Sequence, residues 1–384
     1  GNSPLCYRPI SLINSVVKVI GATVLERMAI WADTHRFFSR AQYGFRKTLS
    51  TIDQDLNCHL ISSKYIIAKQ ESLFVAFMDL SQAFDCVIRE KLWEILYEIG
   101  LDDNLVDFIK NMHASTTACI LIDEEGQTSR EIKINRGVRQ GCIMAPFLFN
   151  VYTNDLESHL LNLAEDSPRV GNTNIPILLY ADDAVLLSRT PKGLQRLING
   201  YTDYMSNLGL SVNILKSYTM TLTKKRCQKK YSFFANNTRL SSVDSFSYLG
   251  IHFDSKISWC PLKNSKQTQL MKTGGALFGF NKHIGGKPVK PMLELYRSKC
   301  VTLALYGAGI WGYIDSKILQ LEENRFWRRL LNVPFNTPAY MIHEELGLPF
   351  LVDRLALQPL LLWFSIWSTS EKTLNREVLL DCME

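Results

Sequence analysis

The sequence predicts an α+β protein, in which strands and helices are mixed in the first two thirds and helices dominate the rest. Short apolar runs typical of buried strands lie at 73–78, 175–180 and 184–187. Stretches with helical apolar spacing lie between them without strict strand–helix alternation, which argues against a doubly wound sheet. From residue 261 onward the pattern is mostly helical.

In chain order, apolar residues at helical spacing predict a first helix over 16–31. The run 73–78 predicts a strand that ends on Asp79, and a helix over 89–100 follows, closed by Gly100. Residues 118–122 and 131–134 predict two strands joined by a turn.

The next predicted elements are a helix over 146–163, a β-hairpin with acids at its tip, a helix over 192–208 and a strand over 247–253. The hairpin comprises 175–180 and 184–187. The apolar stretch 355–367 predicts a buried helix pair, because Gln358 and Pro359 interrupt it. Four tryptophans are the predicted core anchors of the helical part: Trp311, Trp327, Trp363 and Trp367.

Composition places the chain among intracellular globular proteins. Its 384 residues, 46% hydrophobic and 21% charged, suffice for two or more structural units. The nine cysteines are dispersed, which excludes a zinc knuckle or redox pair and fits reduced thiols. No apolar stretch reaches the roughly 20 residues of a membrane span. We therefore expect no membrane partner and a location in the nucleus, the cytoplasm or both.

Positive charge is concentrated in one segment. Residues 214–299 contain 16 Lys and Arg against three acids, whereas the whole chain has a net charge of only +6. This surplus predicts contact with a polyanion, and a solvated basic face is the alternative. The run 224–230 has five basic residues in seven, which fits a nuclear localisation signal, a nucleic-acid-binding loop or a solvated hairpin tip.

Three carboxylates lie at predicted strand ends: Asp79, Asp182 and Asp183. Bringing them together is costly unless a cation is present, and Mg²⁺ binds carboxylate oxygens together with substrate phosphates. Two such ions, about 3.5–4 Å apart, serve in-line phosphoryl displacement. Taken alone, Asp182 and Asp183 also fit an ordinary turn.

Seven motifs occur in order along the chain: 7–12 (YRPISL), 42–46 (QYGFR), 77–85 (FMDLSQAFD), 137–142 (GVRQGC, followed by APFLFN at 145–150), 180–183 (YADD), 209–216 (GLSVNILK) and 248–251 (YLGI). Together they resemble the reverse transcriptases of LINE-type (non-LTR) retrotransposons. The tail strengthens the resemblance and separates it from intron, retron and retroviral enzymes, through LYG at 305–307 with Trp311, RFWRR at 325–329 and ELGLP at 345–349.

The resemblance implies a right-hand polymerase fold, with the catalytic aspartates on the antiparallel sheet of the palm. It divides the chain into fingers at 1–72, palm at 73–254 with interleaved fingers strands at 117–136, a helical thumb at 255–300 and a helical region at 301–384. It also implies an endonuclease upstream in a longer protein, so this chain is expected to be a fragment truncated at its N-terminus.

The same resemblance assigns the metal site to Asp79, Asp182 and Asp183, with help from the Leu80 carbonyl. Two Mg²⁺ ions are expected, with Mn²⁺ as a substitute. Lys216 matches the proposed general acid for pyrophosphate, and a solvated lysine is the alternative.

Several further residues match nucleotide and polynucleotide positions. Phe84 matches the aromatic gate that excludes a ribose 2′-hydroxyl, or is a core phenylalanine. Arg8 and Arg46 match residues that hold triphosphate or template, and Arg46 also fits a structural salt bridge. The remaining positions are Gln140 and Gly141 at the nucleotide, Tyr248, Leu249 and Gly250 in the primer grip, and Lys263, Lys266 and Lys272 along the backbone of the nucleic acid.

The implied function is that of an RNA-directed DNA polymerase, which extends a DNA primer on an RNA template with deoxynucleoside triphosphates. The alternative is an inactive or domesticated remnant that binds nucleic acid without catalysis. The intact set of Asp79, Asp182 and Asp183 favours the enzyme.

Overall fold

The computed structural model describes residues 11–114, 116–122, 126–225, 231–283, 289–368 and 373–383, with the backbone alone at 282 and 283. The chain forms two compact units. The first comprises Gly1–Ser50, Ser72–Met220 and Cys227–Ser242, and the second Thr51–Glu71, Thr221–Arg226 and Val243–Glu384. Residues 51–71 thus group with the C-terminal helices.

A five-stranded sheet in the order β11-β8-β1-β7-β6 forms the centre of the first unit. Its strands are β1 (Leu73–Met78), β6 (Ile177–Tyr180), β7 (Asp183–Ser188), β8 (Tyr218–Leu222) and β11 (Ser241–Ser242). Strand β7 pairs antiparallel with both β1 and β6. All six residues of β1 are buried. The predicted strand 73–78 and the predicted hairpin are therefore confirmed.

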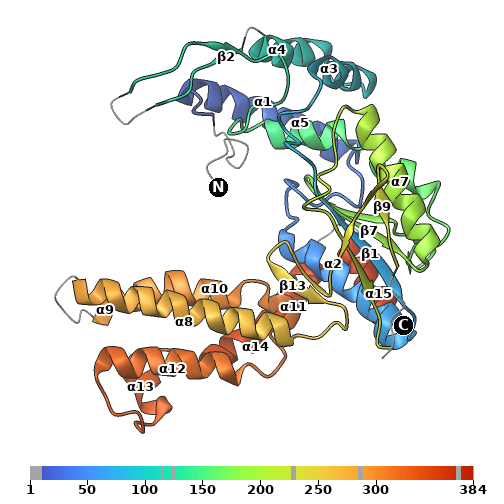
Figure 1. Ribbon diagram of the computed structural model, residues 1–384. Coiled ribbons are helices and arrows are strands. Elements are labelled where there is room, and N and C mark those ends of the chain that lie inside the picture. Colours follow the sequence, from blue (N-terminus) through green and yellow to red (C-terminus); the bar gives the residue numbers. More distant parts are fainter. Residues whose placement is uncertain are drawn as a thin grey trace. The chain divides into compact units, whose positions relative to one another are not determined.

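Helix α7 (Pro191–Asn207) packs against β1 and β7 (Figure 1). It begins at Pro191, where a missing N–H costs nothing, and the Thr190 side chain caps it by accepting from the Gly193 amide. Its apolar residues at helical spacing face the sheet and are fully buried, among them Leu194, Ile198 and Tyr201.

The predicted helix 146–163 is instead two helices, α5 (Ala145–Tyr152) and α6 (Leu156–Leu161). The break lies at Thr153 and Asn154, whose side chains bond main-chain groups. The Thr153 hydroxyl donates to the Phe149 carbonyl, and the Asn154 amide donates to the Phe37 carbonyl. Such side chains compete with the helical bonding pattern and end the first helix. Helix α5 packs on α3 (Arg89–Glu98).

The other elements of the first unit are α1 (Ser15–Thr34), α4 (Asp103–His113), and the short pairs β2 (Thr117–Ala118) with β3 (Ile132–Lys133), β4 (Arg169–Val170) with β5 (Thr173–Asn174), and β9 (Phe234–Ala235) with β10 (Thr238–Arg239). Helix α1 confirms the prediction over 16–31. Helix α4 was not predicted, although Asp102 caps it by accepting from the Leu105 amide.

The second unit is mostly helical, as predicted. It contains α2 (Thr51–Ser63), η2 (Lys64–Ala68), β12 (Ser245–Tyr248), β13 (Ile251–Asp254), α8 (Cys260–His283), α9 (Val289–Tyr296), η3 (Arg297–Val301), α10 (Thr302–Leu305), α11 (Ala308–Trp311), α12 (Lys317–Leu331), α13 (Ala339–Glu345), α14 (Leu351–Ser368) and α15 (Leu374–Met383). Helix α8 packs on α12 and α10, and α14 on α11 and α12.

The predicted single strand 247–253 is a hairpin, β12–β13. Its two-residue turn is Leu249–Gly250, and both residues have positive φ, +42° and +90°. Two positive φ values are what a tight two-residue hairpin requires, and glycine accepts this conformation readily.

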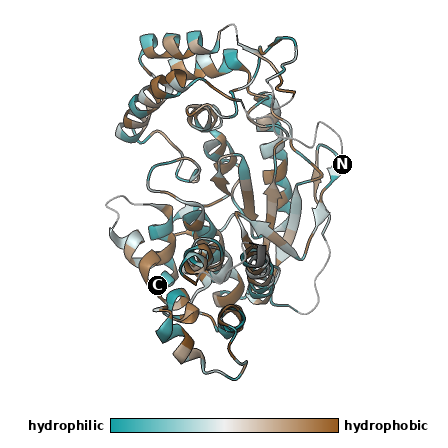
Figure 2. Ribbon diagram, turned by 90° about the vertical axis from the view of Figure 1, so that its left-hand side faces the viewer, coloured by the Kyte–Doolittle hydropathy of each residue, from teal (hydrophilic) through white to brown (hydrophobic). Residues whose placement is uncertain are grey.

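Two predictions about the tail are wrong. The segment 355–367 is one continuous helix around Pro359, and its outer face is apolar and exposed through Leu357, Leu360, Leu361 and Phe364. Trp311 and Trp327 are fully buried, but Trp363 is 42% exposed. Hydrophobic and hydrophilic residues mix along the helices in Figure 2. Throughout the described chain, no helix combines the length and apolar character that crossing a membrane requires.

Replacement of Trp327 by alanine should reduce the free energy of unfolding by about 3–5 kcal/mol, because a fully buried indole is removed from the core. Trp363→Ala serves as the matched control and should cost roughly 1 kcal/mol or less, since that ring is half exposed. Urea denaturation followed by circular dichroism measures both. Equal losses would show that Trp363 also anchors the core.

Candidate active site

The pairing of β1 with β7 brings the predicted acids to one end of the sheet. Met78 lies opposite Ala184, so the next position in the same register places Asp79 beside Asp183. On the other side of β7, Asp183 pairs with Tyr180 of β6, which leaves Ala181 and Asp182 as the hairpin tip. Residues more than 100 positions apart in the sequence thereby become neighbours.

All three carboxylates act on one buried side chain, Tyr201 of α7. Its burial and, after that, the negative charges of Asp182, Asp79 and Asp183 raise the pKa of the Tyr201 hydroxyl well above its ordinary value. The three acids therefore lie within electrostatic range of a single point behind the sheet. Such a concentration of negative charge is stabilised by a cation.

The donor set fits a divalent cation in an open site. Within the described ranges, no group of three or more His, Cys, Asp or Glu side chains is arranged to hold a metal ion without further ligands. Magnesium is ordinarily held by one or two carboxylates, with water and substrate phosphates completing its octahedron. Carboxylates at the open end of a sheet suit that mode of binding.

The Leu80 carbonyl is oriented away from the neighbouring segment. Leu80 forms an isolated bridge with Val212, but the bonds of this bridge use the flanking residues. The Ser81 amide donates to the Ser211 carbonyl, and the Asn213 amide donates to the Asp79 carbonyl, both at 2.8 Å. The Leu80 carbonyl takes no part in this bridge, which is compatible with its predicted role as a metal ligand.

The turn that carries Asp182 is held by the side chain of Gln42, which is 3% exposed. Its Oε1 accepts from the Ala181 amide at 2.8 Å, and its Nε2 donates to the Ala181 carbonyl at 3.3 Å. Ala181 has φ of +55°, a conformation that a non-glycine residue keeps only when its surroundings hold it. Gln42 thus binds both main-chain polar groups of the strained residue before Asp182.

Gly44 allows this close approach. A Cβ at this position would lie 2.2 Å from the Ala181 nitrogen, which is backbone and cannot move aside. Two hydrogen bonds hold the segment around Gly44. The main-chain amide of Tyr43 donates to the Leu179 carbonyl of β6, and the side-chain amide of Asn150 in α5 donates to the Gly44 carbonyl at 2.7 Å. The predicted motif 42–46 therefore supports the acidic turn directly, a role that its sequence did not reveal.

Within the same motif, Arg46 braces its own loop. Its Nη1 donates to the Ser39 carbonyl at 3.2 Å and to the Gln42 carbonyl at 3.3 Å. These bonds support a structural role for Arg46, in which the guanidinium binds main-chain carbonyl groups. Its predicted partner at the triphosphate, Arg8, lies outside the described residues, as does most of the basic run 224–230.

Asp79 is held from the side opposite β7 by Ser217, which is fully buried. The Ser217 hydroxyl accepts from the Asp79 amide at 3.1 Å and donates to the Asn213 carbonyl at 2.8 Å. The adjacent Lys216 is exposed. Its two predicted roles, general acid and solvated lysine, both remain compatible with that position.

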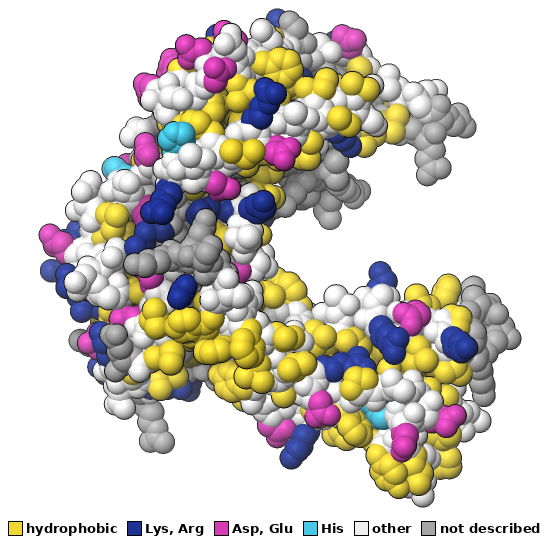
Figure 3. Space-filling model, turned by 180° about the vertical axis from the view of Figure 1, so that it is seen from behind, with side chains coloured by type: hydrophobic (Ala, Val, Ile, Leu, Met, Phe, Trp, Pro, Cys, Tyr) yellow, Lys and Arg dark blue, Asp and Glu magenta, His cyan; other side chains and the backbone are white. Residues whose placement is uncertain are grey.

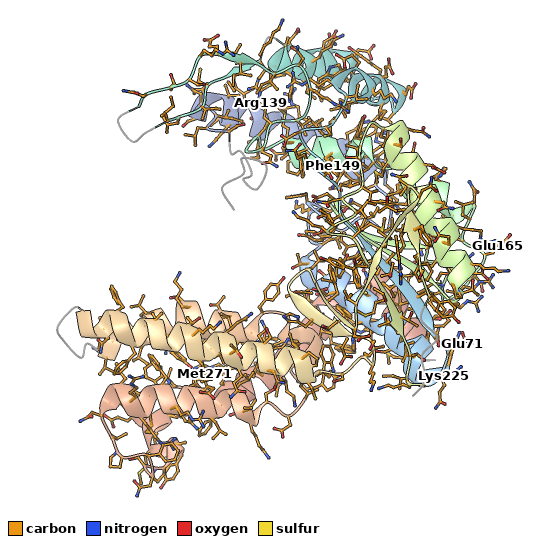
Figure 4. The ribbon with its side chains drawn as sticks, in the orientation of Figure 1. Glu71, Arg139, Phe149, Glu165, Lys225 and Met271 are labelled. Carbon is orange, nitrogen blue, oxygen red and sulfur yellow. The ribbon has the colours of Figure 1, made fainter. Side chains whose placement is uncertain are left out.

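Phe84 is half-buried and packs on Phe149 of α5, with ring centroids 4.9 Å apart. Figure 4 labels Phe149. Its carbonyl accepts from the Val138 amide at 2.9 Å. The predicted gate is thus fixed on one side by the core and on the other by the motif at 137–142. A half-buried ring in this position is compatible with both predicted roles.

Gln140 and Gly141 contact the chain itself. The Ser11 amide donates to the Gln140 carbonyl at 2.9 Å, and a Cβ on Gly141 would lie 2.6 Å from the Ser11 carbonyl oxygen. Gly141 has φ of +101°. The sequence predicts that a nucleotide lies close to the backbone of Gly141. In this structure the backbone at Ser11 lies there.

In the second unit, the prediction that Lys266 contacts nucleic-acid phosphate is wrong. Lys266 is 5% exposed, and its ammonium donates to the Leu303 carbonyl at 2.8 Å. Burial lowers the pKa of Lys266 to about 8. By contrast, Lys272 is exposed on α8, while Lys263 is half-buried and donates to the Asp315 carbonyl. Lys and Arg side chains lie among hydrophobic ones over the helices of this unit in Figure 3.

Residues 3–253 match the family model described as reverse transcriptase (RNA-dependent DNA polymerase). The chain belongs to this family. Membership agrees with the order of the seven motifs and with the palm-like sheet that carries the acids. The predicted right-hand polymerase class and the predicted family are therefore confirmed, and members of this reverse transcriptase family generally use divalent metal ions.

Curated relatives of the chain are polymerases of mobile elements without long terminal repeats, as predicted. It is 27% identical over 372 residues to the Pol polyprotein of the retrotransposable element R2DM from Drosophila melanogaster, covering 91% of this chain and 33% of the relative. It is 23% identical to the RNA-directed DNA polymerase of the mobile element jockey from the same organism, covering 91% and 38%. The chain thus spans about a third of their length.

Among solved structures, the telomerase of Candida albicans resembles 96% of this chain and 55% of that chain, with a TM-score of 0.46 and 12% identity. Apo telomerase from Candida tropicalis gives a TM-score of 0.46 over 95% and 61%.

Substitution of Gly44 by alanine should destabilise the first unit by about 1–3 kcal/mol, because the added methyl group meets the Ala181 backbone. Gly275→Ala in α8 is the matched control. It meets no atom within 4 Å and should stabilise its helix by roughly 0.5–1 kcal/mol. Denaturation and amide exchange across 177–188 measure the effects. A Gly44→Ala protein with unchanged exchange would contradict the described contact.

Proposed function

We propose that this chain is an RNA-directed DNA polymerase, which extends a primer 3′-hydroxyl by nucleotidyl transfer. The observation that carries the proposal is the β1–β7 register, which sets Asp79 beside Asp183 with Asp182 at the adjoining tip. In a chain of the reverse transcriptase family, these are the acids expected at the reacting phosphate.

In this proposal Asp79 and Asp182 hold two divalent ions, with contributions from Asp183 and the Leu80 carbonyl. Bound Mg²⁺ supplies Lewis-acid chemistry, which favours deprotonation of an attacking hydroxyl and offsets charge on phosphate oxygens. The chain contributes orientation, because Gln42 and Ser217 hold the main chain on either side of the acids. Lys216 is the proposed proton donor to pyrophosphate.

The proposed substrates are an RNA template, a DNA primer and deoxynucleoside triphosphates. The relatives, a Pol polyprotein of the retrotransposable element R2DM and an RNA-directed DNA polymerase of the mobile element jockey, support an RNA-directed polymerase of a LINE-type retrotransposon. Because the chain spans about a third of those relatives, an endonuclease elsewhere in the full protein belongs to the proposal. So does its location in the nucleus or the cytoplasm.

No observation on the described chain favours the alternative of a non-catalytic remnant. All three acids are present, and the turn that carries Asp182 is supported by a buried side chain in a conformation that costs free energy.

Replacement of Asp182 by asparagine should reduce Mg²⁺-dependent primer extension on an RNA template at least roughly 100-fold, since a charged ligand is lost while the side-chain volume is kept. Chelation by EDTA should stop the wild-type chain, and Mg²⁺ or Mn²⁺ should restore it. Asp203→Asn, on the exposed face of α7, is the control and should retain activity. Full activity of the Asp182→Asn protein would refute the metal assignment.

Removal of the Phe84 ring in Phe84→Ala should lower discrimination against ribonucleotides, because the space near the sugar opens. The ratio of kcat/KM for deoxy- over ribonucleoside triphosphates should fall by roughly 10–200-fold. This ratio does not depend on the folded fraction, which matters because Phe84 also packs on Phe149. An unchanged ratio would leave Phe84 as a core residue only.

A further inference from the structure

The turn of the β12–β13 hairpin is strained at a non-glycine residue. Leu249 has φ of +42°, which a side chain with a Cβ rarely adopts, and Gly250 follows with φ of +90°. Such a conformation persists only where neighbouring groups hold it. The sequence motif at 248–251 matches the primer grip, so a contact that fixes this turn bears on how a primer end is held.

Tyr306, directly after α10, supplies that contact. Its hydroxyl donates to the Leu249 carbonyl at 2.6 Å and lies 3.3 Å from the Thr51 hydroxyl. Its ring covers the second turn residue, because a Cβ on Gly250 would lie 2.8 Å from the Tyr306 Cε1. One side chain therefore holds the strained residue by a hydrogen bond and the glycine by its ring.

Tyr306 is itself fixed from two directions. The Trp311 indole N–H donates to the Tyr306 carbonyl at 3.4 Å, and the intervening Gly307 has φ of +72°, where a Cβ would meet the Ile251 side chain at 2.6 Å. From α8, the Lys266 ammonium lies 5.2 Å from the centre of the Tyr306 ring. Helix α8 also packs on β13 (Figure 1).

We infer that Tyr306 is a positioning residue for the primer terminus, acting through its hydrogen bond to the Leu249 carbonyl. The inference rests on the proposed function and on the resemblance of residues 248–251 to a primer grip. It gives a role to LYG at 305–307 and to Trp311, tail motifs that the polymerase chemistry did not use. It also gives Lys266 of α8 a role, which is to hold the Tyr306 ring in place.

Tyr306→Phe removes only the hydroxyl and leaves the ring over Gly250. The expected result is a fall of about 10-fold in kcat for primer extension, with little change in the KM for the nucleotide or in the affinity for primer–template. The rate of extension from a mismatched 3′ end, relative to that from a matched end, should rise, because the primer terminus is no longer held in one position. The matched control is Tyr313→Phe, which loses a hydrogen bond from Trp259 in the same unit but does not touch the turn.

A second pair of variants tests the strain directly. Glycine adopts positive φ without support, so Leu249→Gly should make the turn independent of the hydroxyl. The 10-fold effect of Tyr306→Phe should therefore shrink to about 2-fold or less in a Leu249→Gly background. An undiminished effect would mean that Tyr306 acts other than through this turn, and would overturn the inference.

A primer with 2-aminopurine at its 3′ terminus separates this inference from the proposed function. Fluorescence of the bound primer end should change in Tyr306→Phe and not in Tyr313→Phe, whether or not nucleotides are added. If the wild-type chain binds this primer but extends none, the proposed function fails while the fluorescence still decides the inference. Identical fluorescence of the Tyr306→Phe and wild-type complexes, or an equal change in Tyr313→Phe, would overturn it.

Discussion

The antiparallel pairing of β1 with β7 is the constraint on which the site depends. Burial of the apolar side chains of these strands fixes their register, and the register alone sets Asp79 beside Asp183. A slip by one residue would turn every side chain of one strand to the opposite face. The free energy of the apolar pairing therefore also offsets the repulsion of carboxylates gathered at its end.

Around this pairing, distant segments hold the main chain of the acidic residues. Gln42 binds the amide and the carbonyl of Ala181, and Ser217 binds the amide of Asp79. Both side chains are buried, so their bonds are not exchanged with water. The β12–β13 turn of the second unit follows the same principle, with the Tyr306 hydroxyl on the carbonyl of a strained residue. Turns in both units are thus held by side chains from elsewhere in the sequence.

The sequence predicted those elements whose signal is local. An apolar run ending in Asp79 and a hairpin with acids at its tip were found where expected, because strand propensity and turn chemistry lie within a few residues. The support of Ala181 was not predictable, since Gln42 lies 139 residues away and bonds only main-chain atoms. Lys266 was misassigned for a related reason: its charge suggested phosphate contact, whereas tertiary packing buries it.

The assignment of the metal site to Asp79, Asp182 and Asp183 is tested most directly by locating the metal on the folded chain. Fe²⁺ substituted for Mg²⁺ generates hydroxyl radicals in the presence of ascorbate and peroxide, and these cut the backbone next to the bound ion. A metal ion held by the three acids should produce cuts near Asp79 and near Asp182, which excess Mg²⁺ suppresses and Asp182→Asn abolishes. Cuts elsewhere, or cuts at these positions that Mg²⁺ does not suppress, would contradict the assignment.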